Sequence, residues 1–296
     1  MGLSIRRTAR AADSANSSEP LPAPTGRPIP VAFVLGRDAE LVDFAGPWGV
    51  FEYVALEGRK AAPFELFTVA ETAKPLRVSG GLTVVPDYTF ANVPAPKVIV
   101  VPAMGEPSAG MLAWLKRTSP STDLTMSVCN GSFVLARAGL LDGKTVTAHH
   151  GAYGILSASF PAVTVRRGAR FVDDGRISTA GGLTSGIDLA LHVVERYFGR
   201  DVAEATASQL EYQGQGWKDP DSNAVFASRP ASTPDRSVDP VCEMQVDPEV
   251  ALVETYRGQE YFFCSKSCRS TFDADPARFL SPPDEGDVGP GADGRR

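Results

Sequence analysis

The feature of this sequence that most restricts its fold is a repeated alternation of short apolar runs with amphipathic stretches. Residues 97–103 (KVIVVPA) are almost entirely apolar, which is typical of a strand buried on both faces of a sheet. Residues 184–199 instead carry apolar side chains three and four positions apart and end in Gly199, which predicts an amphipathic helix. This alternation predicts an α/β fold with a doubly wound, mostly parallel sheet.

The same patterns predict the other elements of the first domain. We expect strands at residues 30–36, 64–70, 97–103, 124–128, 145–149, 163–167, 170–175 and 176–180, and helices at 47–56, 111–117, 132–141, 184–199 and 202–212. A hairpin is expected around Gly80 and Gly81, and the helix at 132–141 is expected to end at Asp142 and Gly143.

Composition divides the 296 residues into five parts. We predict a disordered tail over 1–29, a main domain over 30–216, a linker over 217–236, a small domain over 237–281 and a second disordered tail over 282–296. The net charge of −6, with scattered cations, does not favour nucleic-acid binding, and no apolar run is long enough for a membrane span. Since no apolar segment follows Arg6 and Arg7, we expect a cytoplasmic protein.

Cys129 lies where a predicted buried strand meets a predicted helix, with Gly131 two residues later. Ligands of open parallel sheets bind at the carboxyl ends of strands, and a tight turn there exposes a nucleophile. The start of the helix is expected to lower the pKa of the thiol, and the backbone N–H groups of Asn130 and Gly131 could face a developing anion. The alternative is a buried structural cysteine.

Three motifs surround this cysteine in order: LVDFAGPWGVFE, VCNGSFVLARAGLLDGKTVTAHH and ISTAGGLTSGIDLALHVVER. Together they resemble the ThiJ/PfpI superfamily, whose fold is the flavodoxin-like fold of class I glutamine amidotransferase-like proteins. The branch that looks nearest contains isonitrile hydratases and the corresponding domains of AraC-type regulators.

The resemblance implies roles for individual residues. It assigns Cys129 as nucleophile, Asp43 as the acidic residue beside the thiol, and His149 as a histidine near it. Asn130 stands where the hydratase branch usually has Thr, and the turn at residues 102–105 (PAMG) replaces the usual Gly-Gly. From the sequence alone, Asp43 could instead cap the helix expected near Pro47.

A second cysteine group lies near the C-terminus, where 21 residues separate Cys242 from Cys264 and three separate Cys264 from Cys268. The last two are spaced to project from one face of a helix, and a hairpin around residues 257–258 would deliver Cys264. A unit of this size has little core, so a metal ion is expected to stabilise it. The segment resembles the YHS domain, a treble-clef-like module. This resemblance implies three cysteine ligands, Cys242, Cys264 and Cys268, with Met244 as a further candidate ligand and zinc or copper as the ion.

These features leave two function classes. The first is a lyase of the isonitrile hydratase type, in which Cys129 adds to the carbon of a small-molecule isonitrile and Asp43 moves the proton, with no cofactor at the thiol site. The second is a redox- or heavy-metal-sensing protein of the stress response that uses Cys129 and the C-terminal cysteines. The resemblance also implies a homodimer, and the residues after 212 do not match a DNA-binding region.

Overall fold

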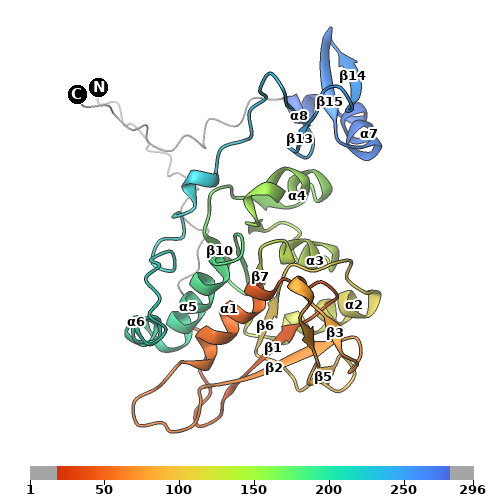
Figure 1. The fold of residues 1–296 in the computed structure, drawn as a ribbon. Coiled ribbons are helices and arrows are strands. Elements are labelled where there is room, and N and C mark those ends of the chain that lie inside the picture. The colour runs from red at the N-terminus through yellow and green to blue at the C-terminus, as the bar shows by residue number, and fades with distance from the viewer. Residues whose placement is uncertain (1–18, 281–296) are drawn as a thin grey trace, which may run out of the picture. The chain divides into compact units, whose positions relative to one another are not determined.

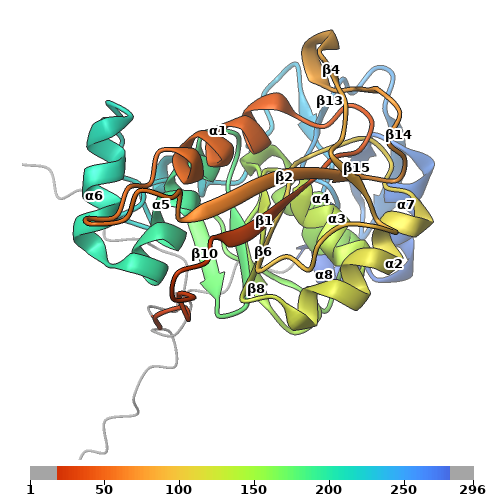
Figure 2. The same ribbon diagram turned by 90° about the horizontal axis from the view of Figure 1, so that it is seen from below.

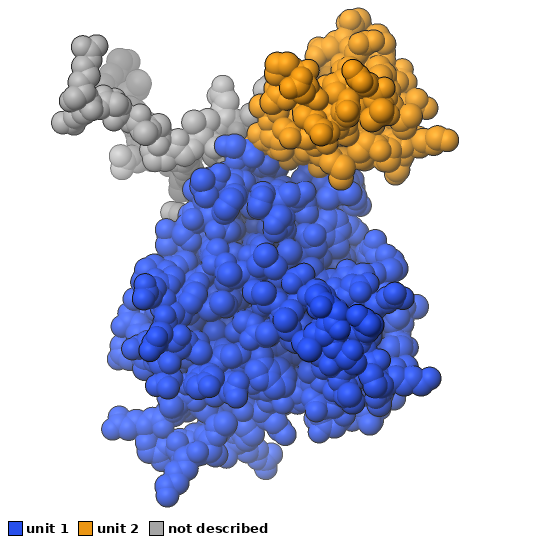
Figure 3. Space-filling model, in the orientation of Figure 1, with its two compact units in different colours: residues 1–228 blue, residues 229–296 orange. Residues whose placement is uncertain are grey.

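The computed structural model describes residues 19–280, so most of the two expected tails lies outside the described residues. The chain divides into two compact units, the first ending at Ser228 and the second beginning at Arg229 (Figure 3). None of the helices in the described range is both long enough and apolar enough to cross a membrane.

The first unit is built on a seven-stranded sheet. Its spatial order is β10 (Phe171–Asp174), β11 (Ile177–Ala180), β7 (Leu124–Val128), β6 (Val98–Val101), β1 (Ile29–Val34), β2 (Phe64–Ala70) and β5 (Tyr88–Thr89). All neighbouring strands are parallel except β10 and β11, which form an antiparallel pair at one edge. The predicted doubly wound, mostly parallel sheet is confirmed.

Helices cover both faces of this sheet, as Figures 1 and 2 show. The first unit contains α1 (Leu41–Glu52), α2 (Ala109–Thr118), α3 (Gly131–Arg137), α4 (Tyr153–Ser159), α5 (Ser185–Phe198) and α6 (Arg200–Gln209). One core cluster joins α1, α5 and α6 to one face of the central strands, and a second joins α2, α3 and α4 to the other. Central strands are therefore apolar on both faces, which explains their unbroken apolar runs.

Two pairs of short strands lie outside the main sheet. The hairpin of β3 (Leu76–Arg77) and β4 (Thr83–Val84) turns at Gly80 and Gly81, as predicted. The strands β8 (Thr145–Val146) and β9 (Thr164–Val165) pair only with each other. The expectation that both would extend the main sheet was wrong, because β10 folds back on β11 and occupies the edge.

The largest differences from the predicted helix ranges are in α1 and α3. The helix α1 begins at Leu41 rather than near Pro47, so Asp43 lies in its first turn and not in a loop. The helix α3 ends at Arg137, because the chain turns at Gly139 with a positive φ of 71°. The expected end at residues 142–143 was therefore too late.

Segments on both sides of the predicted main domain also pack on the first unit. Leu21 is buried, and its N–H donates to the carbonyl of Arg196. Trp217 is only 3% exposed, and the carbonyl of Pro220 accepts a hydrogen bond from the N–H of Arg170. Ordered packing thus begins before residue 30 and continues into the segment predicted as a linker.

Over residues 229–280, the second unit contains two hairpins and two helices. Its elements are β12 (Ser237–Val238), β13 (Gln245–Val246), β14 (Leu252–Tyr256), β15 (Gln259–Phe263), α7 (Lys266–Ala274) and α8 (Pro276–Leu280). Phe263 and Phe272 are fully buried, with ring centroids 5.2 Å apart. The hairpin predicted around residues 257–258 is confirmed.

Candidate active site and metal centre

The thiol of Cys129 lies at the carboxyl end of β7, directly before α3. Its backbone has a φ of 58°, a conformation that non-glycine residues rarely adopt. Its N–H donates to the carbonyls of Gly181 (2.9 Å) and Ala180 (3.2 Å), which fix the turn to the end of β11. This geometry is that of a strand-to-helix nucleophile elbow.

The first residue of α3 must be glycine for this turn to form. A Cβ atom on Gly131 would lie 2.1 Å from the carbonyl oxygen of Val101, at the end of the neighbouring strand β6. From β1 the chain continues to β2 on one side of the sheet, and from β6 it continues to β7 on the other side, so the strand order reverses between β1 and β6. Cys129 therefore stands near the switch point, where ligands of doubly wound sheets bind.

The thiol of Cys129 is protonated at neutral pH. Burial and the charge of Asp43 raise its pKa to about 11, whereas the backbone N–H groups of Asn130 and Leu183 hydrogen-bond to the thiol and lower the pKa only partly. The prediction that the helix start lowers this pKa below its ordinary value was therefore wrong, because the thiol is only 7% exposed. Sequence reasoning also missed the N–H of Leu183, which a left-handed turn with a φ of 46° presents to the sulfur.

Asp43 is fully buried beside this thiol. Its Oδ2 accepts a hydrogen bond of 2.9 Å from the N–H of Ala103, while its Oδ1 has no partner among the described residues. Burial raises the pKa of Asp43 to about 7. The carboxyl group is thus poised to exchange a proton near neutral pH. The N–H of Ala103, in the altered turn at 102–105, is committed to Asp43 and not free to bind a substrate oxyanion.

Ionised Asp43 should destabilise the folded protein. The folded state holds this proton between the ordinary pKa of 3.8 and about 7, so stability falls as pH rises through that window. We expect Asp43→Asn to remove this dependence and to raise the free energy of unfolding by up to about 4 kcal/mol at about pH 8, with little change at about pH 4. Chemical denaturation of both proteins at the two pH values measures this. An equal effect at both would contradict it.

His149 lies against the turn that carries Leu183, with no hydrogen bond to the Cys129 thiol among the described residues. Its Nδ1 accepts from the N–H of Gly151, which leaves the ring proton on Nε2, and burial lowers its pKa. A Cβ at Gly182 would lie 2.5 Å from the imidazole, so Gly182 is what permits this approach. The structure therefore gives His149 a place beside the turn rather than at the sulfur.

A pocket of about 450 Å³ has Asn130, the residue after Cys129, in its lining. Its walls are mostly apolar and include Met104, Phe133 and Ile155. Arg137 also lines it and forms an ion pair of 2.6 Å with Glu106. The volume and lining suit a small organic molecule with an apolar substituent.

The second unit brings together the three predicted cysteine ligands. The Sγ atoms of Cys242 and Cys264 are 3.5 Å apart, and those of Cys264 and Cys268 are 3.6 Å apart. Cys242 and Cys268 are buried and Cys264 is exposed. Cys264 precedes α7 rather than lying on it, so the expected helical pair was wrong although the sulfurs do meet. The three sulfurs fit a soft metal ion.

Asp239 is a member of this cluster that sequence reasoning missed. Its carboxylate lies within 4.8 Å of the three sulfurs and is fully buried. One oxygen accepts from the N–H groups of Val241 (2.8 Å) and Cys242 (3.3 Å), and the other from the N–H of Cys264 (2.9 Å). Asp239 therefore ties together the two segments that carry the sulfurs. The sequence signal for Asp239 was the Asp-Pro-Val-Cys motif at residues 239–242, which places this carboxylate three residues before the first cysteine.

Met244 does not belong to the buried part of this cluster. Its side chain is 55% exposed, whereas its backbone N–H hydrogen-bonds to Cys242 and its carbonyl accepts from the N–H of Asp239. Glu243 before it has a φ of 63°, a backbone conformation that glycine adopts more readily than other residues.

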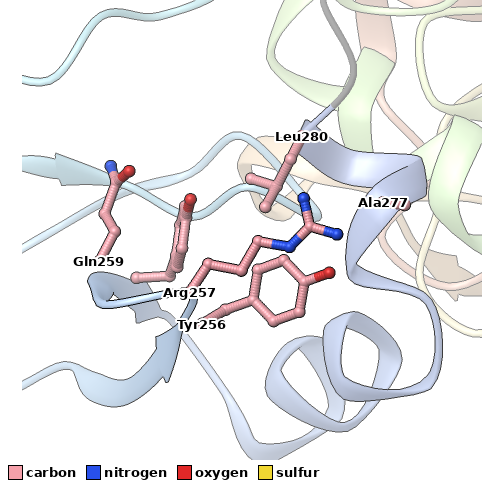
Figure 4. A pocket seen from close by; sticks show the side chains of 6 residues that line it. Tyr256, Arg257, Gln259, Ala277 and Leu280 are labelled. Atoms are coloured by element: carbon pink, nitrogen blue, oxygen red, sulfur yellow. The ribbon is translucent and has the colours of Figure 1, made fainter.

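A separate pocket of about 340 Å³ lies beside the β14–β15 hairpin (Figure 4). Its labelled side chains include Tyr256, Arg257 and Leu280, and the guanidinium of Arg257 lies 5.1 Å from the ring centroid of Tyr256. Its lining contains neither a cysteine nor a carboxylate, so it is not part of the metal centre.

Comparison with known families agrees with these two sites. Residues 30–196 match the model of the DJ-1/PfpI family, and residues 237–282 match that of the YHS domain. Isonitrile hydratase from Pseudomonas putida is 32% identical over 191 residues, which are 62% of this chain and 78% of that enzyme. The transcriptional regulator GbdR from Pseudomonas aeruginosa is 29% identical over 162 residues, or 53% of this chain and 43% of the regulator.

Solved structures show the same fold. A ThiJ/PfpI family protein from Pseudomonas syringae superimposes with a TM-score of 0.58 at 25% identity, covering 72% of this chain and 85% of that one. DJ-1beta from Drosophila melanogaster superimposes with a TM-score of 0.54 at 18% identity, covering 62% of this chain and 98% of that one. The latter similarity concerns the fold alone.

Proposed function

This chain belongs to the DJ-1/PfpI family and carries a C-terminal YHS domain, and from that membership we propose that its first unit hydrates isonitriles to N-substituted formamides. The observation that carries the proposal is the buried pair of Cys129 and Asp43, since a thiol and a carboxyl group beside it are the groups that this addition needs. The 32% identity to an isonitrile hydratase supports it.

The first step is addition of the thiol across the terminal carbon of the isonitrile. The sulfur of Cys129 forms a bond to that carbon, and the thiol proton passes through the Asp43 carboxylate to the same carbon, which gives a thioimidate. The backbone N–H groups of Asn130 and Leu183 stabilise the charge that develops on sulfur. The apolar pocket at Asn130 would hold the nitrogen substituent.

The second step is hydrolysis of the thioimidate. Water adds to its carbon, one water proton passes to the substrate nitrogen, and the other returns to the thiol through Asp43 as the carbon–sulfur bond breaks. The sum is one isonitrile and one water giving one formamide, with the thiol and carboxyl group restored. In this scheme His149 supports the turn that carries the Leu183 N–H and is a positioning residue.

The environment of Cys129 favours this proposal over redox sensing. Sensor cysteines are exposed and have a depressed pKa, because the thiolate reacts with the oxidant. Cys129 is 7% exposed and has a pKa near 11. The neutral thiol is therefore protected until a substrate accepts its proton.

The test is formamide production from cyclohexyl isocyanide by the purified full chain. Turnover that exceeds the rate with buffer and with a heat-denatured sample supports the proposal. Absence of turnover on this and on shorter and longer alkyl isonitriles rejects it.

The pH profile of kcat/KM tests the role of the pair. The reactive form carries one proton shared between Asp43 and Cys129, and this form is dominant between about pH 7 and about pH 11. We expect kcat/KM to rise about tenfold per pH unit up to pH 7 and then to level off. A maximum at acidic pH, with loss of activity above 7, would contradict the proton transfer through ionised Asp43.

A further inference from the structure

The proposed addition places a requirement on the state of the substrate. The terminal carbon of an isonitrile has one lone pair, and that lone pair must accept the proton delivered through Asp43. The same lone pair is the donor with which isonitriles bind soft metal ions. An isonitrile bound to a metal ion through carbon therefore cannot be protonated there, and the first unit can act only after the ion has left.

The second unit has the donor set to take such an ion. The Sγ atoms of Cys242 and Cys268 lie 3.5 and 3.6 Å from the Sγ atom of Cys264. Among the described residues, Asp239 is the one other His, Cys, Asp or Glu in this group. Both oxygens of Asp239 already accept backbone N–H groups. A site with three thiolates and a committed carboxylate suits Cu(I), whereas structural zinc almost always takes four ligands.

The exposure of the three cysteines gives a route for transfer. Cys264 is exposed, while Cys242 and Cys268, whose sulfurs lie 3.5 and 3.6 Å from its sulfur, are buried. An incoming complex can thus meet the sulfur of Cys264 while the isonitrile is still bound to the ion. The two buried sulfurs then displace the isonitrile carbon by ligand exchange.

We infer that the physiological substrate class of this chain is an isonitrile complex of Cu(I), and that the cysteines of the second unit remove the ion before Cys129 reacts. The inference rests on the proposed function. In the transfer the carbon–copper bond breaks, copper–sulfur bonds form, the thiol protons go to water, and copper remains Cu(I). Hydration then converts the freed isonitrile into a formamide, which lacks the carbon lone pair and cannot recapture the ion.

The experiment uses the full chain without oxygen and the Cu(I) complex of cyclohexyl isocyanide. Copper bound to protein is measured after gel filtration, and formamide is measured in parallel. We expect Cys129→Ala to take up copper and to leave the isonitrile unchanged. We expect Cys264→Ser to lower the ratio of the hydration rate on the complex to that on the free isonitrile by at least about tenfold.

Two controls keep this test independent of folding. Wild-type chain preloaded with Cu(I) keeps its native cysteines, and its ratio should fall as for Cys264→Ser. Val250→Ala changes an exposed side chain of the same unit outside the cluster and should leave the ratio at the wild-type value. Equal ratios for wild-type, preloaded and Cys264→Ser chains would overturn the inference, as would failure of Cys129→Ala to take up copper from the complex. Failure of the proposed function appears separately, as no hydration of free isonitrile.

Discussion

Cys129→Ala is expected to lower the rate of isonitrile hydration by about a thousandfold or more, because it removes the atom that forms the covalent bond. Alanine keeps a Cβ and the same left-handed backbone, and Cys129 contributes one small buried side chain to the core. The fold should therefore persist, and the loss should appear in kcat while binding of the formamide product is retained. Hydration rate and thermal unfolding, measured on the same preparations, test both statements.

Two comparisons make this result specific to the sulfur. Cys129→Ser retains a group able to donate a proton but replaces sulfur by a weaker nucleophile, and should lose nearly as much activity. Val42→Ala, which changes a partly exposed side chain next to Asp43 on α1, should stay within about twofold of wild type. A Cys129→Ala chain with a tenth of the wild-type rate would show that the thiol is not the nucleophile.

Removal of the metal ligands is expected to destabilise the second unit. Its buried apolar side chains are few among residues 229–280, namely Val241, Cys242, Val246, Phe263, Cys268 and Phe272, and two of these are cysteines of the cluster. A core of this size supplies little stability, so an ion held by three thiolates would add a large share of it. The double variant Cys264→Ser, Cys268→Ser should therefore lose both the ion and protection of residues 229–280 against proteolysis.

The measurement is limited proteolysis of the full chain with mass spectrometry, alongside metal analysis. The first unit has its own core clusters, so fragments ending near Ser228 should survive. Chelation of the wild-type chain should reproduce the pattern of the double variant, and added Cu(I) or Zn(II) should restore protection only in wild type. Full protection of the metal-free second unit would show that its aromatic core is sufficient.

The sequence predicted those parts of the fold that depend on burial along single elements. The strand at 97–103 was recognisable because both faces of β6 are covered, so all four of its residues are buried. The strands at 145–146 and 164–165 were misplaced because two-residue strands carry no periodicity. Their partners are fixed by tertiary contacts that no local pattern encodes.

At the candidate sites, too, local sequence predicted the positions of residues but not the contacts that they make. The position of Cys129 at a strand end was readable, but the sign of its pKa shift depends on depth of burial and on the nearness of Asp43, which lies 86 positions earlier. Likewise, the three cysteines were evident from their spacing, while the role of Asp239 requires the two hairpins to close. Local motifs predicted which cysteines are candidates for a site, and long-range contacts determine the surroundings of their sulfur atoms.

The boundary between Ser228 and Arg229 has a consequence for how the chain matures. During synthesis the first unit leaves the ribosome complete before the last cysteine is made, and it can fold from its own core. The second unit gains its full stability only when it binds an ion. Newly made chains in a metal-starved cell would therefore carry a folded first unit and a less stable, protease-sensitive second unit, so that metal supply would set the lifetime of the second unit.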